Sequence, residues 1–166
     1  MNESPVRVRR TQRGDFELDL PQEERTLLRS LPHQLRELLS SDDPALERLF
    51  PPAYPDDSDL QSEYERLVRG DLTEQRLGSV DVMEQTIDAS RVSEEQLLAW
   101  LSALNDLRLI LGTKLGATED IDPEDIPEDD PLAPSYALYY YLGWLEEQVV
   151  EALNTGLTPG GPEPAP

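Results

Sequence analysis

The 166-residue chain carries 35 acidic and 14 basic side chains, which gives a formal net charge of −21 at pH 7. A surface this acidic repels a phosphate backbone, so direct nucleic-acid binding is disfavoured. The chain has no cysteine and one histidine, His33, which excludes disulfides, thiolate zinc sites, iron–sulfur clusters, cysteine nucleophiles and zinc sites with two histidines.

Length and patterning predict one domain with a hydrophobic core over residues 5–154. We expect residues 1–4 and the Gly/Pro-rich tail, 155–166, to be disordered. No apolar run follows a basic patch at the start, and the longest nearly apolar stretch, 134–145, is too short to span a bilayer. We therefore expect a cytoplasmic protein without membrane contact.

The first 20 residues show the period of two that is typical of β-strands. Residues 6–10 and 15–20 alternate in side-chain character around a turn at 11–14, which predicts a hairpin with one apolar face. A lone hairpin is marginally stable, so it must lie on the helices. Its basic side chains are Arg7, Arg9, Arg10 and Arg13. This candidate basic patch could pair with the acidic side chains of the second strand, or it could hold a few phosphates.

Helical spacing begins after the hairpin. Pro21 opens a helix that runs to Leu39, and Pro32 is expected to bend or split it. A short helical turn over 44–50 leads into a stiff, proline-rich linker at 51–55.

A long helical region is expected next, after N-cap residues at 56–59. Gly70 and Gly78 are its weak points. Its apolar positions are Leu60, Tyr64, Leu67, Val68, Leu72, Leu77, Val80, Met83 and Ile87.

Ser93 and Gln96 form a capping box, and the helix that follows is apolar on nearly all sides. We expect it to be the central, most buried helix, and to end at Gly112 or Gly116. An acidic loop at 117–133 and a last helix at about 134–154 complete the chain. The predicted fold class is mainly α, a single-domain helical bundle with a small N-terminal β-hairpin.

The acidic loop suggests calcium, because hard cations prefer clustered carboxylates. A helix–loop–helix calcium site needs glycine at its sixth position and glutamate at its twelfth. Counting from Asp120, these positions hold Asp125 and Pro131. We therefore interpret the loop as a solvated linker, and we expect neither a metal nor a cofactor.

Asn105, Asp106 and Arg108 are polar residues inside the apolar helix. Such residues face outward or are paired inside. One interpretation is a structural network in which Asn105 or Asp106 pairs with an arginine of the preceding helix. The other is a partner or ligand site. The candidate arginines are Arg66, Arg69 and Arg76.

Aromatic side chains occupy more faces of the last helix than one core stripe can use. They are Tyr136, Tyr139, Tyr140, Tyr141 and Trp144. Either they divide between core and surface, or some of them form a partner or homodimer surface.

Three stretches together carry a family resemblance: residues 48–55 (RLFPPAYP), 64–67 (YERL) and 103–116 (ALNDLRLILGTKLG). With the spacing between them, they resemble an actinobacterial-type domain-of-unknown-function family that includes the AosR oxidative-stress transcription regulators. Genes of this family often lie beside the Clp protease adaptor and a cysteine biosynthesis cluster. The resemblance covers nearly the whole chain, and 103–108 is its most specific part.

The resemblance implies a helical regulator that acts with a sigma factor or RNA polymerase. AosR-type members sense oxidation through a pair of thiols, and this chain has none. We therefore expect a non-enzymatic interaction protein that regulates transcription through protein–protein contacts without a thiol switch. An adaptor for Clp-dependent proteolysis is one alternative, and a carboxylate-based enzyme that uses Asn105, Asp106 and Arg108 is another.

Overall fold

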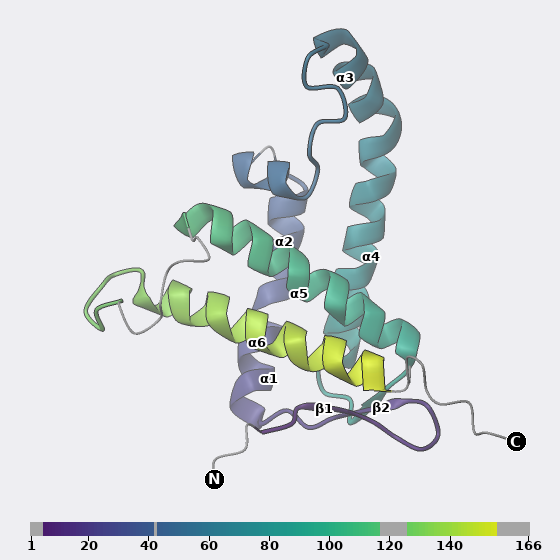
Figure 1. The fold of residues 1–166 in the computed structure, drawn as a ribbon, viewed down its shortest axis with the longest axis vertical. Coiled ribbons are helices and arrows are strands. Elements are labelled where there is room, and N and C mark those ends of the chain that lie inside the picture. The colour runs from purple at the N-terminus through teal and green to yellow at the C-terminus, as the bar shows by residue number, and fades with distance from the viewer. Residues whose placement is uncertain (1–4, 42, 117–125, 156–166) are drawn as a thin grey trace, which may run out of the picture.

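The computed structural model describes residues 5–41, 43–116 and 126–155. The described chain is mainly helical with a small antiparallel sheet, which confirms the predicted fold class (Figure 1). Its elements are β1 (Val8–Arg10), β2 (Phe16–Leu18), α1 (Gln22–Arg29), α2 (Leu31–Leu39), η1 (Pro44–Arg48), α3 (Ser58–Tyr64), η2 (Glu65–Arg69), α4 (Gly70–Thr86), β3 (Arg91–Val92), α5 (Glu94–Leu115) and α6 (Ala133–Thr155).

The sheet has one strand more than the predicted hairpin. Strands β1 and β2 pair antiparallel with Val8 opposite Leu18, and β3 pairs with β2 so that Val92 lies opposite Phe16. Phe16 is fully buried. The third strand has two residues and lies between two long helices, so its sequence is too short to show a strand period.

Helices α1 and α2 divide at Ser30, next to the predicted breaking point. Pro32 lies in the first turn of α2, where its missing N–H costs no helical hydrogen bond. In the last turn of α2, Arg36 binds Asp81 (2.7 Å) and Glu84 (2.6 Å) of α4. These contacts fix α2 along the long helix.

Helix α5 lies between α4 and α6 and is the centre of the bundle, as predicted (Figure 1). The capping box forms, since the Ser93 N–H donates to Gln96 Oε1 at 2.8 Å and the Gln96 N–H donates to Ser93 Oγ at 3.1 Å. The helix ends at Gly116, whose φ of 63° suits glycine. Trp100 is buried and donates from Nε1 to Thr86 Oγ1 at 2.7 Å.

The long helical region leaves the bundle at its N-terminal end. Only the second half of α4 contributes buried residues, and α3 and η2 contain none. Leu60 is 45% exposed and Leu67 is 65% exposed, so these two apolar positions are outside the core. Figure 1 shows α3 far from the sheet, where no other helix covers it. We call residues 54–69 the arm.

Disorder was predicted for 1–4 and 155–166; of these, 1–4 and 156–166 lie outside the described residues, and Thr155 is the last residue of α6. Residues 117–125 of the acidic loop also lie outside the described residues. In the part of the chain that is described, no helix is long and apolar enough to cross a membrane.

Candidate functional site

The base of the arm is built around Phe50. The Arg69 guanidinium lies 4.8 Å from the Phe50 ring centroid, and that of Arg76 lies 5.3 Å from it. Both arrangements are cation–π contacts. Arg69 ends η2, a π-helical turn, and such turns are frequent at functional sites.

Asp106 connects this base to the bundle. Its side chain is 1% exposed, and Arg76 binds its Oδ1. Arg76 also donates to the Leu49 carbonyl at 3.3 Å. Burial raises the pKa of the Asp106 carboxyl, and the Arg76 charge opposes that shift. Arg76 is therefore the arginine that completes the predicted network.

The three stretches that carry the family resemblance meet at this point. A cleft of about 90 Å³ brings Tyr64 and Glu65 beside Phe50 and Pro51. Through Arg76, the same region reaches Asp106 of the third stretch. The contact therefore joins segments that are far apart in the sequence.

The other predicted polar residues lie elsewhere. Arg108 approaches Glu146 of α6 with Nε 3.1 Å from Oε2, in an ion pair without hydrogen-bond geometry. The pKa of Glu146 is raised, because burial is the largest effect and the opposing charge of Arg108 offsets only part of it. Asn105 is half-buried and Arg66 is exposed. The structure thus places Asp106 and Arg108, two residues of the predicted cluster, in two different helix–helix contacts.

The predicted interface aromatics make contacts within the chain. Tyr136 Oη donates to the Leu115 carbonyl at 3.1 Å, and the Tyr140 ring lies edge-on to Tyr139 at 5.4 Å. Tyr139 packs on Gly112 so closely that an added Cβ there would lie 2.8 Å from its ring.

Tyr141 and Trp144 take part in a network with the N-terminus. Tyr141 Oη donates to Glu24 Oε1 at 2.7 Å, and Arg7 binds Glu24 with Nη2 at 2.7 Å and Nε at 3.0 Å. The Arg7 guanidinium also lies 5.5 Å from the Trp144 ring. This network joins the hairpin, α1 and α6. All five aromatics are half-buried, and their role at an interface stays a prediction.

The candidate basic patch is divided. Arg7 binds Glu24 of α1, and Arg10 donates from Nη2 to the Leu153 carbonyl at 3.0 Å, whereas Arg9 and Arg13 are exposed. In register, Arg9 lies opposite Glu17.

The acidic strand has a second cationic neighbour that the sequence did not suggest. Arg91 of β3 lies 3.8 Å from Glu17 and 4.0 Å from Asp15. The cross-strand pairing considered for the hairpin is therefore joined by a cation from the third strand, which the sequence analysis did not include.

Arg25 is a structural residue that sequence reasoning missed. Its guanidinium donates to the carbonyls of Leu18 (3.1 Å), Leu20 (3.0 Å) and Ala89 (3.1 Å), and also to that of Ile87. These hydrogen bonds link α1 to the C-terminal end of β2 and to the residues that follow β2 and α4. A helix-surface arginine gives no local signal of such contacts.

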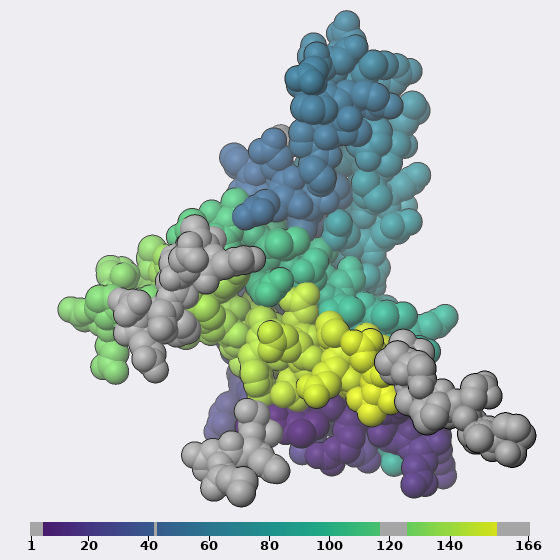
Figure 2. All heavy atoms as spheres, in the orientation of Figure 1, coloured from purple at the N-terminus to yellow at the C-terminus, as the bar shows by residue number. Residues whose placement is uncertain are grey.

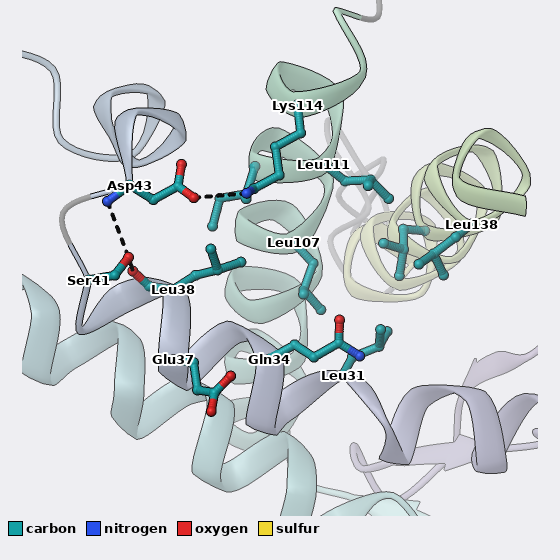
Figure 3. A pocket seen from close by; sticks show the side chains of 12 residues that line it. Leu31, Gln34, Glu37, Leu38, Ser41, Asp43, Leu107, Leu111, Lys114 and Leu138 are labelled. Carbon is teal, nitrogen blue, oxygen red and sulfur yellow. Dashed lines mark hydrogen bonds and ion pairs between the residues drawn. The ribbon is translucent and has the colours of Figure 1, made fainter. Parts of the chain in front are cut away.

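An apolar cleft of about 530 Å³ lies between α2, α5 and α6 (Figure 3). Lys114 and Asp43 form an ion pair of 2.8 Å at its edge, and Glu37 also lines it. Its apolar lining includes Leu31, Leu38, Leu107, Leu111, Leu138 and Leu142. In the described residues, no three histidine, aspartate or glutamate side chains gather closely enough to hold a metal ion.

Comparison with known proteins gives one family and several relatives. The family described as "Domain of unknown function (DUF2017)" matches residues 4–153. The "Putative oxidative stress regulator AosR" of Mycobacterium leprae is 36% identical over 134 residues, which cover 68% of this chain and 59% of the relative. The "Oxidative stress regulator AosR" of Mycobacterium tuberculosis is 35% identical over 130 residues, which cover 67% and 58%. The chain thus spans less than two thirds of these relatives. No solved structure matches it significantly.

Proposed function

The chain belongs to the DUF2017 family, and on this basis we propose that it is a non-enzymatic regulator that acts on transcription through protein–protein contacts. The observation that carries the proposal is its identity of 35–36% to proteins named oxidative stress regulators, over about two thirds of this chain. Asp106 and Arg108 are also engaged in contacts between helices. That use favours a structural role for both over a catalytic one.

The proposed partner is a sigma factor or RNA polymerase. A net charge of −21 favours encounter with a basic protein surface and opposes contact with DNA itself. Such complementarity acts mainly on the association rate and on specificity. Binding should therefore weaken as the salt concentration rises.

Regulation without a thiol switch is part of this proposal. Residues 1–166 contain no cysteine, so no disulfide can form within them. Methionine oxidation is an inefficient replacement, because Met83 is fully buried and oxidants reach exposed side chains first. We propose that the partner's state, or the abundance of this chain, controls the interaction.

The test is a binding experiment with purified components. The chain is immobilised and exposed in turn to RNA polymerase core, to isolated sigma factors, and to Clp chaperone and protease from the same host. We expect salt-sensitive binding to a sigma factor or to polymerase. Binding to Clp components alone would replace the proposal with an adaptor in regulated proteolysis.

A further inference from the structure

We propose that the arm is a docking helix that inserts Leu60 and Leu67 into an apolar groove with a basic rim on a protein partner. This inference deepens the proposed function, since it assigns the surface through which the regulator binds. Helices that bind in grooves use apolar side chains about two turns apart on one face. Leu60 of α3 and Leu67 of η2 are seven residues apart along one continuous helical segment whose second part is the π-helical turn, so they lie close to two turns apart.

Both leucines are available to a partner. Leu67 is 65% exposed and Leu60 is 45% exposed, and Tyr54, also in the arm, is 43% exposed. Figure 2 shows the arm standing clear of the bundle, with no other part of the described chain over its tip. A partner could therefore reach the helix from the face that Figure 2 shows.

The arm is ordered by local contacts and not by burial. Asp57 Oδ1 accepts the N–H groups of Asp59 and Leu60, each at 3.1 Å. The Tyr54 N–H donates to Gln61 Oε1 at 2.8 Å. Because α3 and η2 bury no residue, the leucines contribute little to the stability of this chain. A helix that is formed in advance loses less entropy on binding.

The base of the arm is held firmly. Arg69, at the end of η2, contacts the Phe50 ring. Arg76 of α4 contacts the same ring and also binds Asp106. These contacts fix the direction in which the arm leaves the bundle. The leucines are therefore presented at a defined distance from the core.

Charge identifies the kind of partner. The arm contains five acidic and two basic side chains. A groove with lysine and arginine at its rim complements such a helix, whereas DNA phosphates repel it.

A second copy of this chain fits less well. Its own apolar cleft is edged by Glu37 and by Asp43, and Asp43 already holds Lys114. Docking the acidic arm there would bring like charges together, which opposes association. Charge therefore favours a different, basic protein.

The first experiment compares two full-length variants. One carries Leu60→Asp and Leu67→Asp, and the matched control carries Leu98→Asp at a leucine of α5 that is 49% exposed. Binding to purified RNA polymerase holoenzyme is measured by biolayer interferometry at low and high salt. We expect the arm variant to lose affinity at least about tenfold and the control to stay within about twofold, since exposed substitutions leave the fold intact. Equal losses, or an arm variant that binds normally, would overturn the inference.

A second experiment separates this inference from the proposed function. If the unaltered chain does not bind the transcription machinery, the proposed function fails, and the arm is then tested by photo-crosslinking. Benzoylphenylalanine replaces Leu67 or Leu98 in the native host, and the crosslinked peptides are sequenced. We expect a crosslink from position 67, absent at position 98, to an apolar groove rimmed by lysine and arginine. A crosslink to a second copy, to a neutral or acidic surface, or no crosslink at all would reject the inference.

Discussion

Arg76 on α4 binds the carboxylate of Asp106 on α5, and the two side chains are buried to very different extents. Asp106 is 1% exposed, whereas the Arg76 side chain is 27% exposed. The acid therefore depends on the arginine for neutralisation, while the arginine keeps contact with solvent. Because Arg76 also donates to the Leu49 carbonyl and contacts Phe50, one side chain links α4, α5 and the linker after η1.

Replacing this arginine should destabilise the fold. We expect Arg76→Ala to lower the free energy of unfolding by about 3 kcal/mol at pH 7, because it leaves Asp106 as an unpaired buried charge. Urea unfolding followed by circular dichroism measures the change. Arg66→Ala, at an exposed position of the arm, is the control and should cost less than about 0.5 kcal/mol. Equal losses would mean that the ion pair does not stabilise the bundle.

The same variant makes a prediction about pH. Burial raises the pKa of Asp106 in the folded protein, so the folded state takes up this proton at a higher pH than the unfolded state does. Protonation removes the buried charge. The loss caused by Arg76→Ala should therefore be smaller at pH 5 than at pH 7. A loss that does not change between these pH values would contradict the assignment.

Asp106 shows how far sequence reasoning reaches. A charged residue inside an apolar helix predicts an internal partner, and the sequence offered three arginines. Choosing Arg76 requires the crossing geometry of α4 and α5, which depends on packing of the whole bundle. For the same reason, the helical spacing of Leu60 and Leu67 could not indicate that this N-terminal part of the long helical region lies outside the core. The cleft between α2, α5 and α6 could not be predicted either, because it forms only where three helices that are distant in the sequence pack together.

Arg25 should tolerate no conservative replacement. Its planar guanidinium donates to four carbonyls, one in β2 and three in the segments that follow β2 and α4, whereas a lysine ammonium is a single point donor. We expect Arg25→Lys to lower the free energy of unfolding by about 2–3 kcal/mol, since buried carbonyls lose their donors. Arg29→Lys, at an exposed ion pair with Asp88, should change it by less than about 0.5 kcal/mol. Thermal unfolding of both variants distinguishes the two sites.

The central position of α5 gives a packing prediction. Leu104 is fully buried, so Leu104→Ala should cost about 2–5 kcal/mol through lost apolar contact and the cavity left behind. Leu98→Ala on the same helix removes a side chain that is 49% exposed and should cost less than about 1 kcal/mol. Chemical unfolding gives both values. A loss below about 1 kcal/mol for Leu104→Ala would place the core elsewhere.

Glu146 should make the protein more stable as pH falls, whereas an ordinary salt-bridged acid, whose pKa is lowered, makes it less stable. Burial is the main cause of its raised pKa, and the Glu147 charge adds to it, while Arg108 acts against both. As pH falls, the folded protein binds this proton before the unfolded protein does, so the carboxyl becomes less unfavourable to folding. Its contribution is least favourable near neutral pH and improves as pH falls through the raised pKa.

The variant Glu146→Gln removes this titration and keeps the shape of the side chain. Relative to the unaltered protein, it should therefore be most favourable at pH 7 and should lose that advantage as pH falls toward 4. Urea unfolding at several pH values measures the difference between the two proteins. Glu151→Gln, at an exposed position of α6, shows what the loss of one exposed carboxylate does to the same curve. If the curve for Glu146→Gln runs parallel to that of the unaltered protein, the carboxyl of Glu146 does not titrate abnormally and its contact with Arg108 carries no pH dependence.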